Sequence, residues 1–156
     1  MARTEHYNDP DAPKANSIVV AVTAFVLDEH GRVLLIRRTD NDLWALPGGA
    51  QDFGEYIAET AVRETREEAG VDIEVLDVVG IYTNPNHVVA YTDGEVRQQF
   101  SICFRGRYLG GELTPSDESS EVRWVPREEL DDLKIHPSMR LRINHGYENR
   151  QRPYIG

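Results

Sequence analysis

The sequence predicts a single α+β domain. Apolar and β-branched residues gather in short runs separated by turn signals, which is typical of strands. One segment, residues 55–69, instead places small and apolar residues at helical spacing. The chain has 156 residues, of which 40% are hydrophobic and 28% charged, as expected for one globular unit. It contains no internal repeat and no low-complexity tract.

The elements before the helix are strands joined by polar turns. We expect residues 1–16, which are polar, to form a flexible or loosely docked arm ahead of one domain at 17–156. Residues 17–27 are rich in Val, Ile, Thr and Phe and predict a central strand. A polar Asp-Glu-His-Gly turn makes residues 32–38 the expected hairpin partner. The segment 44–49 begins with apolar residues and ends in a Pro-Gly-Gly turn, ahead of the helix.

The segment 55–69 is the clearest helix of the chain. Gly70 follows it in the position favoured for a left-handed cap. The residues on its apolar stripe are Ala58, Ala61, Val62, Thr65 and Ala69. Most of them are small, so we expect the helix to lie close against a sheet. The strands expected after it are residues 73–82, 87–91, 98–108 and 121–125, and the helices are 127–133 and 137–147.

The charge balance and composition exclude some classes of function. The chain has 27 acidic and 17 basic residues, a formal charge of −10, so its surface repels a nucleic-acid backbone and we expect no nucleic-acid polymer as partner. No apolar run approaches the roughly 20 residues that span a bilayer, and residues 1–16 lack the apolar stretch of a secretory signal. The single cysteine, Cys103, fits a reducing compartment. We therefore expect a cytoplasmic protein with no membrane partner.

Three carboxylates crowd one face of the predicted helix. Glu64, Glu67 and Glu68 are spaced i, i+3, i+4, which places their Cβ atoms about 5–6 Å apart. They repel one another, and the C-terminal half of a helix further disfavours negative charge. A solvated acidic face paired with Arg63 and Arg66 would be the ordinary interpretation of an isolated helix. Oxygen-rich clusters become favourable around a hard dication, and the surrounding pattern favours that second interpretation.

That pattern is the segment 49–71, GAQDFGEYIAETAVRETREEAGV. Its fixed positions are Gly49, Glu55, Arg63, Glu64, Glu67, Glu68 and Gly70. At every one of them the segment resembles the Nudix box, the signature of the Nudix hydrolase family. Thr65 stands where the family usually has a larger aliphatic residue. Because Thr65 lies on the apolar stripe, this departure concerns packing rather than chemistry.

The resemblance implies both a fold and a site. The implied fold is the family's α/β/α sandwich, with a mixed sheet and a strand–loop–helix site. The implied cofactor is Mg²⁺ or Mn²⁺. Its implied ligands are Gly49 (through the carbonyl), Glu64, Glu67 and Glu68. Arg63 would orient a carboxylate through bidentate pairing, and Glu55 would support the loop or bind metal through water.

The implied reaction is hydrolysis of a diphosphate bond. Divalent ions neutralise the phosphate oxygens and lower the pKa of a bound water, which attacks one phosphorus. A general base usually helps; the helix could supply it, and in some family members it comes from an acidic residue on a later loop. The candidates on such a loop are Glu118 and Glu121. For either residue a solvated acidic loop is the alternative, and Glu118 ranks first because it precedes the expected strand.

The box does not determine the substrate. The chain is similar to small bacterial ADP-ribose pyrophosphatase-like Nudix proteins, and Pro85 approximately matches a characteristic proline of certain ADP-ribose hydrolases. This favours a nucleoside diphosphate linked to another moiety, either ADP-ribose or a nucleotide sugar. The alternatives are a house-cleaning nucleoside triphosphate pyrophosphohydrolase and a nucleotide-sensing Nudix domain without catalysis. Degenerate domains usually lose box carboxylates, which this chain keeps. The resemblance also allows a homodimer.

Polar residues near the end of the chain have two interpretations each. Arg140 and Arg142 could meet a substrate phosphate, or they could be solvated residues of the last helix, which we favour. His136 could cap that helix or touch a ligand, and the sequence does not choose between these roles.

Overall fold

Ten strands and three helices build the part of the domain that the computed structural model describes, residues 3–156. The strands are β1 (Arg3–Tyr7), β2 (Ser17–Leu27), β3 (Val33–Arg38), β4 (Trp44–Ala45), β5 (Gly48–Ala50), β6 (Val71–Tyr82), β7 (His87–Tyr91), β8 (Val96–Gly111), β9 (Ser119–Val125) and β10 (Tyr154–Ile155). The helices are α1 (Ile57–Ala69), the 3-10 helix η1 (Arg127–Asp132) and α2 (Pro137–Glu148). None of these helices is long and apolar enough to cross a membrane.

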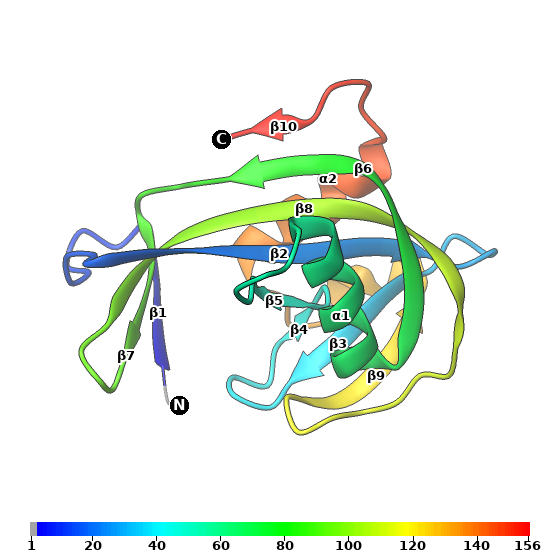
Figure 1. Cartoon of the computed structure of the whole chain (residues 1–156), viewed down its shortest axis with the longest axis horizontal. Coiled ribbons are helices and arrows are strands. Elements are labelled where there is room, and N and C mark those ends of the chain that lie inside the picture. The colour runs from blue at the N-terminus through cyan, green and yellow to red at the C-terminus, as the bar shows by residue number, and fades with distance from the viewer. Residues whose placement is uncertain (1–2) are drawn as a thin grey trace.

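The strands pair into one mixed sheet. Its main path runs β1-β7-β8-β2-β3-β4, while β5 pairs with β2, β9 with β3, and β6 with both β8 and β10. β2 and β8 are parallel, from Ser17 opposite Arg97 to Leu27 opposite Arg107, whereas β6 is antiparallel to β8. Figure 1 shows the curved sheet with α1 lying across one face. The mixed sheet and its helices confirm the α+β fold class.

Each face of the sheet buries its own core, because side chains alternate along a strand. On β2, Phe25 belongs to the core that also contains Ile143 of α2. Its neighbours Ala24 and Val26 belong to the opposite core, which contains Ala69 of α1. α1 and α2 therefore cover opposite faces, and the middle of β2 is buried on both sides. This arrangement is the α/β/α sandwich that the family resemblance implies.

The segment expected to be a flexible or loosely docked arm, 1–16, contains a strand. Residues 3–7 form β1, which pairs antiparallel with β7. Arg3 also forms an ion pair with Asp40, with 3.0 Å between Nε and Oδ2. Backbone pairing and ion pairs, rather than apolar side chains, hold this edge strand in place. Its sequence therefore shows no alternation of apolar and polar residues, which is why the strand was not predicted. Residues 1–2 of the expected arm lie outside the described residues.

Sequence patterns predict the longer elements well and miss the shortest ones. β2 and β7 have the predicted bounds. The helix predicted at 127–133 is the shorter 3-10 helix η1, and α1 begins at Ile57 rather than Glu55. β4, β5 and β10 have only two or three residues each, which is too few for a periodic pattern to emerge.

The two-sided burial of β2 predicts a strong dependence of stability on Phe25. Phe25 is fully buried, whereas Ile18, at the start of the same strand, is 61% exposed. We expect Phe25→Ala to lower the free energy of unfolding by about 3–5 kcal/mol and Ile18→Ala to change it by roughly 0.5 kcal/mol or less. Urea unfolding followed by circular dichroism measures both. Equal losses in the two variants would contradict the packing described here.

Candidate active site

α1 turns two of its clustered carboxylates inward and one outward. Glu64 and Glu68 are 9% and 3% exposed, whereas the side chain of Glu67 is 59% exposed. Glu64 and Glu68 are about one helical turn apart, so both reach the sheet. The sequence predicts one shared face for all three residues. In the structure Glu67 lies at the solvent edge of that face.

A third carboxylate reaches the inward pair from a distant loop. Carboxylate oxygens of Glu64, Glu68 and Glu118 lie within 4.8 Å of one another, and we call these three residues the carboxylate cluster. The loop that carries Glu118 is fixed beside α1, because the Ser119 hydroxyl donates to the backbone carbonyl of Glu68 at 2.6 Å. The backbone N–H of Thr39 holds the Glu118 carbonyl at 3.1 Å. Segments 50 residues apart in the chain therefore meet at one point.

The other loop candidate, Glu121, lies outside the carboxylate cluster. It belongs to β9, where its carboxylate accepts a hydrogen bond from Arg37 at 2.8 Å. Its side chain is 47% exposed. β9 begins at Ser119, so Glu118 precedes the strand, as expected, while Glu121 is engaged in an ion pair on the sheet. Of these two residues, the structure brings only Glu118 to the carboxylate cluster.

The glycine turn before α1 lets the carboxylates approach the sheet. The backbone N–H of Gly48 donates to Oε1 of Glu68 at 3.1 Å. A Cβ atom on Gly49 would lie 2.5 Å from the Glu64 carboxylate, so any side chain there would displace that group. β5 is anchored in turn by antiparallel pairing with β2. The close approach therefore follows from residues that the sequence already marks as a turn.

Burial and proximity make the carboxylate cluster unfavourable on its own. Burial raises the pKa of Glu64. Burial likewise raises the pKa of Glu68, and repulsion from Glu64 adds to that rise. A hard dication would remove the repulsion and would take oxygen donors of this kind as ligands. The residues present therefore fit a divalent metal ion, which the carboxylate cluster could hold.

Arg63 links the loop to the helix. Its guanidinium forms a bidentate pair with Glu55, with nitrogen–oxygen distances of 2.7 and 3.0 Å. The same group donates to Glu64 at 2.9 Å and to Glu67 at 3.2 Å. The hydrogen bonds from Arg63 bring the pKa of Glu55 down to about 2. Glu55 also accepts from the backbone N–H of Asp52 at 2.9 Å, so both of its oxygens already bind protein donors.

A cavity of about 420 Å³ extends from the carboxylate cluster across the sheet. Its lining includes Glu64, Glu118 and the glycines of β5, and also Glu5, His87, His136 and Arg142. We call this cavity the cleft. Its lining includes side chains from β1, β7 and α2, so segments from both halves of the sequence build it.

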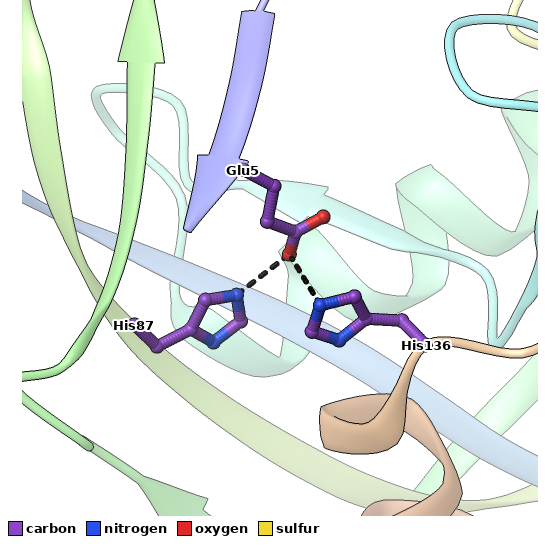
Figure 2. Close-up of side chains that lie close together, drawn as sticks. All are labelled: Glu5, His87 and His136. Carbon is purple, nitrogen blue, oxygen red and sulfur yellow. Dashed lines mark hydrogen bonds and ion pairs between the residues drawn. The ribbon is translucent and has the colours of Figure 1, made fainter. Parts of the chain in front are cut away.

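Three side chains meet in the cleft away from α1. Figure 2 shows the imidazoles of His87 and His136 directed toward one carboxylate oxygen of Glu5. His87 Nε2 lies 2.6 Å from that oxygen and His136 Nε2 lies 3.7 Å from it. Burial alone would raise the pKa of Glu5, but the hydrogen bond from His87 and the charges of the two histidines and of Arg3 bring it to about 2. We call Glu5, His87 and His136 the distal cluster.

The distal cluster was not predicted from the sequence. Its residues come from β1, β7 and the start of α2, with no spacing that would link them. His136 caps α2 by accepting the backbone N–H of Ser138 at its Nδ1 atom, 3.1 Å away, and it also lines the cleft. The capping role was one of the two interpretations left open for this residue.

The two tail arginines differ from each other. Arg140 donates to the backbone carbonyls of Leu130 at 3.1 Å and Leu133 at 2.6 Å. Arg142 is only 4% exposed, so the solvated position favoured for it was wrong. α2 packs this side chain against the ring of Tyr82 on β6, 4.8 Å from guanidinium carbon to ring centre.

A family model matches most of the chain that carries this site. Residues 18–144 match the NUDIX domain. The chain belongs to the NUDIX family. It is therefore a Nudix hydrolase by family, and the resemblance of residues 49–71 to the Nudix box is confirmed.

Individual relatives of this Nudix chain carry different activities in their names. The chain is 33% identical to a putative 8-oxo-dGTP diphosphatase of Bacillus subtilis (strain 168), over 76% of this chain and 73% of the relative. It is 31% identical to an ADP-ribose pyrophosphatase of Methanocaldococcus jannaschii, over 69% of this chain and 62% of the relative. The structure of an ADP-ribose pyrophosphatase from Streptococcus suis 89-1591 superposes with a TM-score of 0.70 at 23% identity, over 88% of this chain and 98% of that one. That structure supports the fold alone.

The repulsion within the carboxylate cluster predicts stabilisation by divalent ions. At 100 times its Kd, a bound ion adds about 2.7 kcal/mol to stability, or roughly 5–10 °C in Tm for a domain of this size. We expect Mg²⁺ or Mn²⁺ to raise Tm in the wild type and in Glu128→Gln, whose side chain is exposed on η1. Glu68→Gln should lose most of the shift. Differential scanning fluorimetry after EDTA treatment measures it, and an equal shift in Glu68→Gln would refute metal binding at the cluster.

Proposed function

We propose that this Nudix hydrolase cleaves the diphosphate bond of a nucleoside diphosphate linked to another moiety, with ADP-ribose or a nucleotide sugar as the favoured substrate. The observation that carries the proposal is the convergence of Glu64, Glu68 and Glu118 beside a cleft that Glu64 and Glu118 line. The cleft volume of about 420 Å³ is suited to a small molecule. The M. jannaschii relative supports ADP-ribose as the substrate.

Mg²⁺ or Mn²⁺ is the proposed cofactor. The proposed ligands are the Gly49 carbonyl, Glu64, Glu67 and Glu68. When bound, the ion would neutralise the diphosphate oxygens and lower the pKa of the attacking water. Glu64 already lines the cleft, and the carboxylate of Glu68 lies beside that of Glu64. Glu67 would first leave its hydrogen bond to Arg63, which its exposed side chain can do.

The chain's own residues would position the groups that react. Arg63 donates hydrogen bonds to both Glu64 and the loop residue Glu55, so Glu55 would support the loop before α1. Glu118 is the proposed general base. It would take a proton from the attacking water while the bond from the attacked phosphorus to the bridging oxygen breaks. The other phosphate group is the leaving group, and it keeps the bridging oxygen.

A second candidate function is nucleoside triphosphate pyrophosphohydrolysis. The B. subtilis relative, whose name is putative 8-oxo-dGTP diphosphatase, favours it. The same carboxylate cluster would serve either reaction, since both break a phosphoric anhydride. A nucleotide-sensing domain without catalysis is less well supported, because every carboxylate of the box is present and two of them are buried together.

A cytoplasmic location and a homodimer are also proposed. Cys103 is fully buried and unpaired, which is consistent with a reducing compartment. The dimer rests on the family resemblance, and sedimentation velocity would measure the mass in solution.

Substrate preference and metal dependence are tested together. Purified protein is incubated with ADP-ribose, nucleotide sugars, dinucleoside polyphosphates, NADH and nucleoside triphosphates, each with Mg²⁺ or Mn²⁺. We expect preferred hydrolysis of ADP-ribose or a nucleotide sugar, loss of activity in EDTA, and recovery when Mg²⁺ is restored. Product chromatography identifies the bond that is cut. Activity that persists in EDTA would rule out the metal-dependent mechanism, and silence across the panel would favour the sensing alternative.

The two loop glutamates provide a matched test of the general base. A general base contributes about 10²–10⁴-fold to rate. We therefore expect Glu118→Gln to lower kcat at saturating metal by at least about 100-fold, and Glu121→Gln, which only loses an ion pair to Arg37, to keep nearly full activity. Steady-state kinetics at several metal concentrations separate a base from a ligand. Equal activity of the two variants would remove Glu118 from this role.

A further inference from the structure

Arg142 is a buried cation without a counter-ion. Its guanidinium has one side-chain hydrogen-bond partner, the Ser138 hydroxyl, at a long 3.4 Å from Nη1. Its Nε atom is buried and has no partner. Among residues 3–156, no carboxylate lies within the 4.0 Å of an ion pair with it. Burying an unpaired charge is costly, so this position is chemically incomplete without a ligand.

Arg142 lines two adjoining cavities. Arg142 lines the cleft and also a second cavity of about 290 Å³. The residues shared by the two linings are His87, Gln99, Ser138 and Arg142. A ligand in the cleft would therefore lie against Arg142. Because Tyr82 covers one side of the guanidinium, its edge is the part left to meet a ligand.

The start of α2 places a hydroxyl beside Arg142. α2 begins at Pro137 after the cap His136, and the backbone N–H groups of residues 138–140 already donate to His136. Ser138, in this first turn, carries the hydroxyl closest to Arg142. The same hydroxyl lies 2.7 Å from Nδ1 of His136, which fixes its position. A hydroxyl and a guanidinium thus meet at the same point.

The polar contacts of the distal cluster are satisfied within the protein: His87 is hydrogen-bonded to Glu5 at 2.6 Å, and His136 lies 3.7 Å from the same carboxylate. The backbone N–H of Ser138 donates to Nδ1 of His136, so the proton of the neutral imidazole lies on Nε2, the atom that faces Glu5 in Figure 2. A nitrogen that carries a proton cannot bind a metal. Arg3, 4.0 Å from Glu5, adds a positive charge that would repel a cation. The hydrogen bond with His87 and the charge of Arg3 therefore compensate Glu5, which forms no ion pair with Arg142.

We propose that Arg142 and Ser138 form an anion subsite that binds a phosphoryl group of the substrate, away from the carboxylate cluster. The inference rests on the proposed function, because it places the substrate of that reaction in the same cleft. It adds a selectivity: a diphosphate that carries a further phosphate monoester binds more tightly than its counterpart without one. The guanidinium edge supplies paired donors to phosphate oxygens. The Ser138 hydroxyl, which donates to Nδ1 of His136, accepts from Nη1 of Arg142 and so orients the guanidinium.

The test uses inorganic phosphate and the metal-free protein. Phosphate is titrated in EDTA at constant ionic strength, and the Arg142 Nε–H resonance, assigned by its loss in Arg142→Lys, is followed by NMR. We expect a saturable shift of this resonance. Calorimetry should show phosphate binding at least tenfold weaker in Arg142→Met, with a smaller loss in Ser138→Ala. Arg127→Met, which removes an exposed arginine of η1, should bind as the wild type does.

Three results would overturn the subsite. The first is an Arg142 resonance that does not shift when phosphate is added. The second is a phosphate affinity of Arg142→Met equal to that of the wild type. The third is a shift produced by a nucleoside but not by phosphate, which would make the pocket a binding site for the base. If Arg142→Met does not fold, the wild-type resonance and Ser138→Ala decide. Because the titration is done in EDTA, it is independent of catalysis. Phosphate binding without hydrolysis of any substrate would overturn only the proposed function. Hydrolysis of a substrate without phosphate binding would overturn only the subsite.

Discussion

The close approach of α1 to the backbone of β5 is the constraint on which the site depends. It holds two carboxylates against the sheet, at a distance that only a glycine at position 49 allows. The small residues of the α1 stripe make this approach feasible, and Ala61 and Thr65 are almost fully buried there. The Thr65 hydroxyl donates to the Ala61 carbonyl at 2.7 Å, so the residue that departs from the family's usual aliphatic buries no unsatisfied polar atom. The departure changes packing and leaves the carboxylates in place.

Local sequence patterns predict most of the fold and part of the site. β2, α1 and the cap at Gly70 follow from periodicity and composition, because each has its own signal within a few residues. The spacing of the α1 glutamates is likewise local. Which of them faces inward depends on where β5 lies, and for that reason the exposure of Glu67 could not be read from the sequence. The position of Glu118 depends on where β9 begins. The strand starts at the next residue, Ser119, and strand boundaries cannot be predicted from sequence to within one residue.

The distal part of the cleft could not be predicted for a different reason. Glu5, His87 and Arg142 are far apart in the chain, and only the pairing of β1 with β7 and the packing of α2 bring them together. Arg142 has the sequence context of a surface residue, and its burial is a property of the tertiary fold. The cleft therefore combines acidic groups whose positions are encoded locally with basic and imidazole groups whose positions depend on the whole sheet. A bound substrate would experience opposite local charges along its length.

The edge strands β1 and β10 both contribute residues to the cavities, so a ligand bound there would stabilise the edges of the sheet. β1 supplies Glu5 and Arg3 to the cleft, and Tyr154 of β10 lines the neighbouring cavity, while β10 pairs with β6 through only two residues. Edge elements of this size open by local unfolding at a small free-energy cost. A ligand that contacts them would bind the docked state alone, and by mass action it would protect their amides from hydrogen exchange. The margins of the sheet would thus be the most ligand-sensitive part of the molecule, although the proposed metal ligands lie on α1, away from those margins.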